Sequence, residues 1–307
     1  MTHQHPEGHH SPPQTPGQSP QQPGQQGAQA GKQGGFNPQA AQARARIESM
    51  KKQFEQRRSM TAAMAEIKYQ IGVYSGKGGV GKTSVAVNLA VTLAQGGAKV
   101  GILDVDIDCP NVVRAMKVYE PPVVSEDKKM DPPERFGVKV MSMAFFQENE
   151  DEAIIWRGPM IHNAIQQILQ STQWGPLDYL VVDMPPGTSD SPLTVMQTLS
   201  LDGFVVVSTP QELAMVDAKR SINMIKTLKL NVLGVVENMA GDMFGSGGGE
   251  QLAAEMGLRF LGRTEMRKDY RDGTKPASLV SKDVRKEYEH IAAEVKKALA
   301  ESAKEAS

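Results

Sequence analysis

Apolar runs and helical stripes alternate along most of the chain. From residue 69 onward, short and mainly apolar runs are separated by longer segments in which apolar residues recur every three or four positions. The short runs are typical of parallel strands buried on both faces, and the periodic segments are typical of helices packed on a sheet. This alternation predicts an α/β, doubly wound domain with a mostly parallel sheet. We expect strands at residues 69–74, 99–105, 138–145, 179–182, 203–208, 231–237 and 258–262, and helices at 84–95, 160–170, 191–199, 212–228 and 284–300.

The first 66 residues follow neither pattern. Residues 1–40 are rich in Gln, Pro, Gly and His, and they carry too little apolar surface to offset the entropy of ordering, so we expect a disordered tail. Residues 41–66 contain helix formers of mixed charge, with Ile47, Met50 and Phe54 on one face. A charged amphipathic helix or linker is expected there, which either binds a partner or membrane surface or packs on the following domain at 67–307.

Composition narrows the class of protein. The formal net charge is −1, which gives no general electrostatic reason to expect a nucleic-acid partner. No apolar run approaches the ~18 residues of a transmembrane segment, and the first residues lack the pattern of a secretory signal. One cysteine, Cys109, excludes an intramolecular disulfide and suits a reducing compartment. A cytoplasmic protein is expected.

Residues 76–83 match the phosphate-loop pattern G-x-x-x-x-G-K-[ST] between a predicted strand and a predicted helix. The glycines allow successive backbone N–H groups to converge on an anion. Lys82 is expected to reach the β- and γ-phosphates of a nucleotide, and the Thr83 hydroxyl is expected to bind Mg²⁺. The expected nucleotide-binding positions are Gly76, Lys77, Gly78, Gly79, Val80, Gly81, Lys82, Thr83 and Ser84.

Carboxylates stand at the ends of two later strands, where parallel sheets form ligand sites. Asp106 is expected to orient the attacking water, while Asp104 and Asp183 are expected to support Mg²⁺ together with Thr83. The loop after Asp183 contains Gly187, whose backbone N–H is expected to reach the γ-phosphate; the alternative is a rigid Pro-Pro-Gly turn.

A third strand end supplies candidates for base recognition. Asn238 closes the strand at 231–237 and can hydrogen-bond a purine edge, although a lone asparagine is more commonly a turn former. Pro210 ends the preceding strand and is expected to line the same side of the nucleotide.

The phosphate loop, with its early lysine, resembles that of the MinD/ParA-type NTPases. More narrowly, residues 71–275 resemble the Mrp/ApbC group of iron–sulfur cluster carrier ATPases. The resemblance implies ATP hydrolysis with Mg²⁺ in a nucleotide-sandwich homodimer, in which Lys77 reaches the partner's phosphates and acts with Lys82 and Asp106 in catalysis. The segments that carry it are residues 76–83, 156–160, 183–190, 209–214, 236–239 and 247–250.

The resemblance breaks where the family usually carries a Cys-x-x-Cys pair, through which two subunits hold one [4Fe–4S] cluster. The corresponding residues 240–246 contain no cysteine and form a shorter segment. Cys109 lies beside the predicted nucleotide and is a single thiolate, whereas such clusters normally need four. No iron–sulfur ligands are therefore identified, and Cys109 is interpreted as a packing residue or a redox-sensitive thiol.

Two functions remain open. The family motifs favour an ATPase in iron–sulfur protein maturation, which would need a cysteine-bearing partner, such as a paralogue in a heterodimer, and apo iron–sulfur client proteins. The missing cysteines favour a MinD/ParA-like nucleotide switch that recruits a partner or surface without any cluster. A third possibility, a scaffold whose ATPase activity has been lost, conflicts with the intact Lys77, Lys82, Thr83, Asp106 and Asp183.

Overall fold

The structure, a computed structural model, describes residues 64–147 and 158–305. The predicted tail at 1–40 and nearly all of the predicted helix at 41–66 lie outside these ranges. The strands are β1 (Ile67–Ser75), β2 (Val100–Asp104), β3 (Val123–Val124), β4 (Met130–Asp131), β5 (Glu134–Arg135), β6 (Val138–Ser142), β7 (Leu177–Asp183), β8 (Gly203–Ser208), β9 (Val232–Ala240) and β10 (Phe260–Glu265).

Helices separate most of these strands. They are α2 (Lys82–Gln95), α3 (Val112–Met116), α4 (Gly158–Ser171), α5 (Asp190–Thr198), α6 (Glu212–Thr227), α7 (Gly248–Met256), α8 (Ala277–Val280) and α9 (Lys282–Glu305), with 3₁₀ turns η1 (Met143–Phe146) and η2 (Lys268–Arg271). No helix in the described ranges is long and apolar enough to cross a bilayer.

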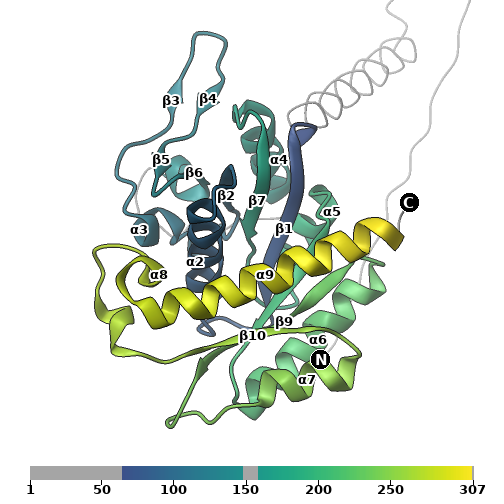
Figure 1. The fold of residues 1–307 in the computed structure, drawn as a ribbon. Coiled ribbons are helices and arrows are strands. Elements are labelled where there is room, and N and C mark those ends of the chain that lie inside the picture. Colours follow the sequence, from purple (N-terminus) through teal and green to yellow (C-terminus); the bar gives the residue numbers. More distant parts are fainter. Residues whose placement is uncertain (1–63, 148–157, 306–307) are drawn as a thin grey trace, which may run out of the picture. The chain divides into compact units, whose positions relative to one another are not determined.

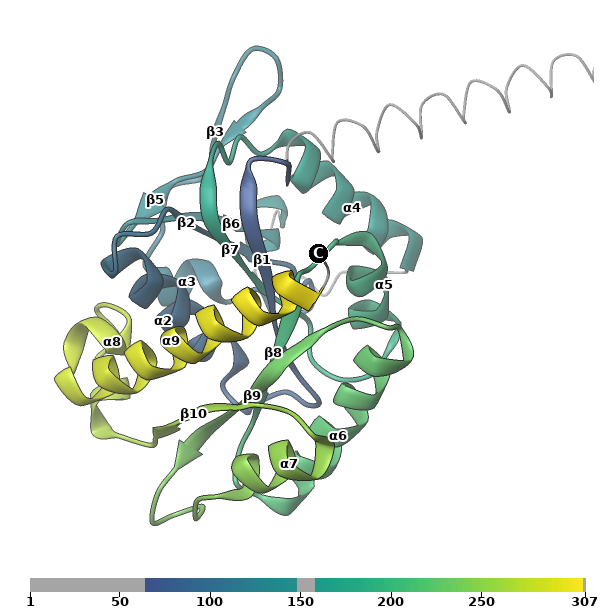
Figure 2. The same ribbon diagram turned by 45° about the vertical axis from the view of Figure 1, so that its right-hand side comes forward.

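The main sheet has the strand order β10-β9-β8-β1-β7-β2-β6-β5 (Figure 1). All neighbours pair in parallel except β5, which runs antiparallel to β6 at one edge. Helices α2, α3, α8 and α9 pack on one face, and α4, α5, α6 and α7 pack on the other (Figure 2). The predicted doubly wound α/β fold is confirmed.

The sheet register aligns the strand ends that carry the candidate site. Val73 of β1 pairs with Asp183 of β7, and Asp104 of β2 also pairs with Asp183. Because these strands are parallel, the loops after all three leave the sheet at the same edge. The phosphate loop and both carboxylate-bearing strands therefore meet there.

The structure corrects one predicted strand and adds short elements that were not predicted, namely α3, α7, α8, β3, β4 and β5. The strand predicted at 138–145 ends at Ser142, and the chain turns into η1 because the Ser142 hydroxyl accepts a hydrogen bond from the Ala144 N–H and caps the turn. Helix α7 was not predicted, since its first turn begins with glycines, which are poor helix formers. Asn238 lies within β9, which continues to Ala240, rather than at its end.

Candidate functional site

The phosphate loop connects β1 to the N-terminus of α2. Gly79 and Gly81 have φ angles of 82° and 84°, in the left-handed region that favours glycine. The loop starts close to helix α6, since a Cβ added to Gly76 would lie 2.2 Å from the carbonyl oxygen of Asp217 in that helix. The Ser75 hydroxyl donates to the Lys77 carbonyl at 3.0 Å and braces the turn. Backbone N–H groups at a helix N-terminus then face the space where an anion can bind.

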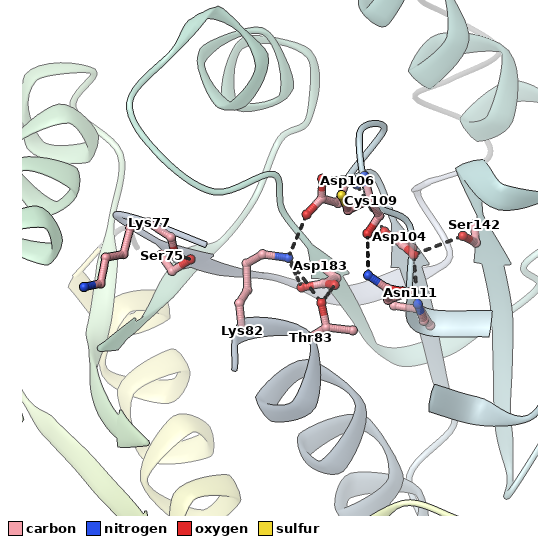
Figure 3. Close-up of polar contacts among 11 residues, drawn as sticks. Ser75, Lys77, Lys82, Thr83, Asp104, Asp106, Cys109, Asn111, Ser142 and Asp183 are labelled. Carbon is pink, nitrogen blue, oxygen red and sulfur yellow. Dashed lines mark hydrogen bonds and ion pairs between the residues drawn. The ribbon is translucent and has the colours of Figure 1, made fainter. Parts of the chain in front are cut away.

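Three buried charged side chains and the hydroxyl of Thr83 form a cluster at the end of this loop (Figure 3). The Lys82 amine lies 2.7 Å from Asp183 Oδ1 and 3.4 Å from Asp106 Oδ2. The Thr83 hydroxyl donates to Asp183 Oδ2 at 2.6 Å. Lys82, Asp106 and Asp183 are 6%, 5% and 0% exposed. These contacts bring together four residues from three different elements that the sequence identified as site candidates.

The proximity of these charges shifts their pKa values. Burial lowers the pKa of Lys82, but the carboxylates of Asp183 and Asp106 more than offset this, so its pKa is raised. Burial raises the pKa of both Asp183 and Asp106, and Lys82 opposes that rise without cancelling it. Because a buried ion pair is costly to desolvate, this cluster is a weak source of stability. Buried charged groups with shifted pKa values are instead typical of functional sites.

Asp104 lies behind this cluster and is fully buried. Its Oδ1 accepts the Asp106 N–H at 3.1 Å, and its Oδ2 accepts the Val112 N–H and the Ser142 hydroxyl, both at 3.0 Å. These contacts tie the loop after β2 to the start of α3 and to β6. The predicted support of Mg²⁺ by Asp104 stays a prediction, because in this structure its carboxylate holds the backbone in place.

The donor set near Thr83 suits Mg²⁺. The Thr83 hydroxyl and the Asp183 carboxylate are hard oxygen donors, 2.6 Å apart, at the mouth of the phosphate loop. Mg²⁺ usually takes one or two such protein ligands and completes its shell with water and phosphate oxygens. The residues present therefore fit a Mg²⁺–nucleotide complex.

Two cavities adjoin the loop and share Met239. The first, of about 430 Å³, is lined by the phosphate loop, by the segment after β2 and by the segment after β7. The second, of about 530 Å³, lies beside the start of α2 and is lined by Ser84, Asn238, Met239, Met243, Glu265, Met266, Arg267, Lys268, Tyr270 and Arg271. Their volumes fall in the usual range for small-molecule sites.

Two of the predicted nucleotide contacts, Gly187 and Pro210, are placed differently from the expectation. The Gly187 N–H donates to the Ser75 carbonyl at 2.9 Å, so this loop would have to rearrange before that N–H met a phosphate. Pro210 lines neither cavity; its backbone lies against α7, where a Cβ on Gly248 would come within 2.8 Å of its carbonyl oxygen. The Lys77 side chain lines the first cavity but points away from Lys82 (Figure 3).

Cys109 is exposed in the first cavity, and its N–H donates to Asp106 Oδ1 at 3.4 Å. Within residues 64–147 and 158–305, no group of three or more His, Cys, Asp or Glu side chains is arranged to hold a metal ion. Cys109 is the one cysteine of the sequence and cannot by itself supply the four thiolates that a [4Fe–4S] cluster normally needs, so the residues present do not fit such a cluster.

Sequence reasoning missed the residues that shape the second cavity. Glu265, Arg267 and Tyr270 line it and end or follow β10, so the rule that ligands bind at the carboxyl ends of parallel strands was the signal that could have found them. It also missed Glu237, a fully buried carboxylate that accepts the N–H groups of Gly247 and Gly249 at the start of α7.

The fold, the phosphate loop and the Lys82–Asp183 cluster define a P-loop NTPase. The model of the NUBPL iron-transfer P-loop NTPase family matches residues 66–300. An iron–sulfur cluster carrier protein of Methanocaldococcus jannaschii is 42% identical over 221 residues, covering 65% of this chain and 73% of that protein. A mitochondrial iron–sulfur protein of Arabidopsis thaliana required for NADH dehydrogenase is 42% identical over 255 residues, covering 76% and 80%. The chain belongs to the NUBPL iron-transfer P-loop NTPase family.

Solved structures agree with this assignment. A nucleotide-binding protein of Archaeoglobus fulgidus, in complex with ADP, superimposes with a TM-score of 0.61 at 34% identity, covering 77% of this chain and 92% of that chain. The cell division ATPase MinD of Pyrococcus furiosus superimposes with a TM-score of 0.60 at 22% identity, covering 75% and 99%. The second likeness supports the fold alone.

Proposed function

We propose that this protein binds and hydrolyses ATP with Mg²⁺ and uses that cycle in the maturation of iron–sulfur proteins. The observation that carries the nucleotide chemistry is the Lys82–Asp183–Thr83 cluster at the end of the phosphate loop. Family membership, with relatives named as iron–sulfur cluster carriers, supports the cellular role.

The charged cluster suggests how binding proceeds. Lys82 is held by Asp183 and Asp106, and an incoming phosphate would offer it a more complete set of charge-assisted hydrogen bonds. Transfer of the amine to the phosphate would release both carboxylates. Asp183 and Thr83 would then hold Mg²⁺, which supplies charge neutralisation of the phosphates.

Asp106 is proposed to orient the attacking water. It is close to the phosphate loop through its 3.4 Å ion pair with Lys82, and it lines the first cavity. Burial raises its pKa, which strengthens it as a hydrogen-bond acceptor for water once Lys82 has moved away. Hydrolysis would let the segments after β2 and β7 relax.

The second cavity is proposed to hold the nucleoside. It adjoins the first through Met239 and contains the predicted base contact, Asn238. Tyr270 also lines this cavity, and its buried hydroxyl has no hydrogen bond of normal geometry among the described residues. Burial raises the pKa of this hydroxyl, and the nearby Tyr288 and Thr264 hydroxyls oppose that rise in part. A ribose or base atom would satisfy the Tyr270 hydroxyl.

We propose that the active form is a dimer, either of two copies or with a cysteine-bearing paralogue. The support is Lys77, which lines the phosphate cavity while its side chain points away from Lys82 (Figure 3). This orientation supports a role for the Lys77 amine at the nucleotide of a facing subunit. Lys77→Ala should therefore reduce the ATP hydrolysis rate far more than it weakens ATP binding. Unchanged turnover in that variant would argue against the dimer.

The iron–sulfur cluster is treated as cargo. With one cysteine in the chain, at least some of its thiolate ligands must come from a partner or from an apo client protein. The test is anaerobic incubation with iron and sulfide, followed by visible absorbance and iron counting, for the protein alone and with a cysteine-bearing family member. We expect a cluster only in the mixture. A cluster on the pure protein that survives Cys109→Ser would contradict this ligand assignment.

The alternative is a nucleotide switch that recruits a partner without any cluster. It is favoured by the loop at residues 241–245, which carries no cysteine and instead presents Met243, 77% exposed. If no mixture holds a cluster in the anaerobic experiment while ATP still drives dimerisation, the switch is the better description.

A further inference from the structure

The Asn238 side chain is held at both ends of its amide. Its Nδ2 donates to the Val80 carbonyl in the phosphate loop at 2.8 Å, and its Oδ1 accepts the Thr264 hydroxyl at 2.5 Å. Asn238 is 4% exposed and Thr264 is fully buried. A Cβ on Gly81 would lie only 2.1 Å from Nδ2, so the amide is also packed tightly against the loop.

These contacts allow one orientation of the amide. The Val80 carbonyl only accepts, so the nitrogen end must face the phosphate loop. The hydroxyl of Thr264 then supplies the donor that holds the oxygen end. Without that donor, the oxygen end would be a buried acceptor with no partner among the described contacts, and the Val80 hydrogen bond and the packing on the loop alone would oppose rotation of the amide.

A held amide can distinguish the two purines. After its two contacts, Asn238 keeps one N–H and one lone pair, and it lines the second cavity. Adenine offers an amino donor beside a ring-nitrogen acceptor, and an asparagine amide matches that pair. Guanine carries an acceptor, O6, where adenine carries its donor. An amide that can turn over fits either arrangement, whereas an amide held in one orientation fits only one.

We propose that Thr264 is a positioning residue that holds the Asn238 amide and thereby sets the preference of the second cavity for adenine over guanine. This proposal rests on the proposed nucleotide function. It assigns a role to a buried hydroxyl on β10 that does not itself need to touch the nucleotide.

The test is the ratio of dissociation constants for GTP and ATP, measured by competition against a fluorescent ATP analogue in Mg²⁺ buffer. Wild type should prefer ATP. Thr264→Val, which keeps the shape and removes the donor, should lower the ratio by about tenfold, and Thr264→Ser, which keeps the donor, should restore it. Thr92→Val is the matched control: the Thr92 hydroxyl is buried on α2 without a partner among the described residues and lines neither of the two cavities.

A pure stability effect would weaken ATP and GTP binding equally, so the ratio separates positioning from folding. If Thr264→Val does not fold, Thr264→Cys, a weaker donor of similar size, should give an intermediate ratio. An unchanged ratio in whichever of these two variants folds overturns the proposal, as does a wild type that binds both nucleotides equally. A wild type that binds neither nucleotide overturns the proposed function itself.

Discussion

Glu237 holds the segment that follows β9 through hydrogen bonds to its backbone, and substitution of Glu237 should lower the melting temperature of the protein. The carboxylate is fully buried and accepts the Gly247 N–H at 3.0 Å and the Gly249 N–H at 2.6 Å, while the Arg263 Nε lies 3.4 Å away. Both glycine N–H groups belong to the start of α7, where a negative charge is also favoured by the helix dipole.

The magnitude follows from what Glu237→Gln removes. Glutamine keeps one acceptor oxygen, loses the charge and turns an NH₂ group toward a backbone donor. A lost charge-assisted hydrogen bond and a buried N–H without a partner together cost about 3 kcal/mol. For a domain of this size, that corresponds to a decrease of roughly 6–12 °C in the melting temperature.

The chain offers a matched control on the same arginine. Glu250 pairs with Arg263 at 2.8 Å, but its side chain is 62% exposed, and such a pair contributes less than about 1 kcal/mol. Differential scanning calorimetry without nucleotide should therefore separate Glu237→Gln from Glu250→Gln. Hydrogen exchange should also become faster at the amides of residues 247–249 only in the first variant. Equal melting temperatures for the two variants would refute the reasoning.

Two further predictions concern the phosphate loop and the carboxylates behind it. Gly76→Ala should lower the melting temperature, since its Cβ would lie 2.2 Å from the Asp217 backbone and cost about 1–3 kcal/mol, whereas Gly78→Ala, with nothing within 4 Å, should not. Burial, followed by the charge of Asp183, raises the pKa of Asp104 from 3.8 to about 8. The folded protein therefore binds this proton more tightly than the unfolded chain does, and the resulting stabilisation is complete below pH 3.8 and is lost as the pH rises through 8. Thermal melts from pH 6 to 8.5 should show stability falling more steeply in wild type than in Asp104→Asn.

Either prediction can fail clearly. Similar melting temperatures for Gly76→Ala and Gly78→Ala would mean that the loop tolerates the close approach of α6. Parallel pH profiles for wild type and Asp104→Asn would mean that the buried carboxyl does not hold its proton through neutral pH.

The fold was largely predictable because the strands are buried on both faces and therefore appear as apolar runs. Gly203–Ser208 was predicted with both ends correct, since every residue of this central strand is buried. The same reasoning extended β6 too far, because Met143 and Phe145 continue the apolar run while the backbone has already turned. A run of apolar residues indicates that a segment is buried, and it does not indicate where the backbone changes from a strand to a turn.

The site was predictable only where its parts are contiguous or lie at strand ends. Lys82 and Thr83 follow from a local motif, and Asp183 from its position at the end of an apolar strand. The contact between Asn238 and Thr264 joins positions 26 residues apart, on two strands whose register shifts irregularly, so no local pattern predicts it. Glu237 was hidden for a similar reason: its partners are backbone N–H groups, which no side-chain pattern reveals.

The exchange of Lys82 from its carboxylates to a nucleotide phosphate is tested most directly by the affinity for ATP with Mg²⁺. Isothermal titration calorimetry should be run on wild type and on Lys82→Met, with circular dichroism to confirm that the variant is folded. We predict that wild type binds ATP and that the variant binds it at least about tenfold more weakly, because a charge-assisted hydrogen bond to phosphate is lost. Equal affinity in the two proteins, or no binding by wild type, would contradict the assignment of this cluster as a nucleotide site.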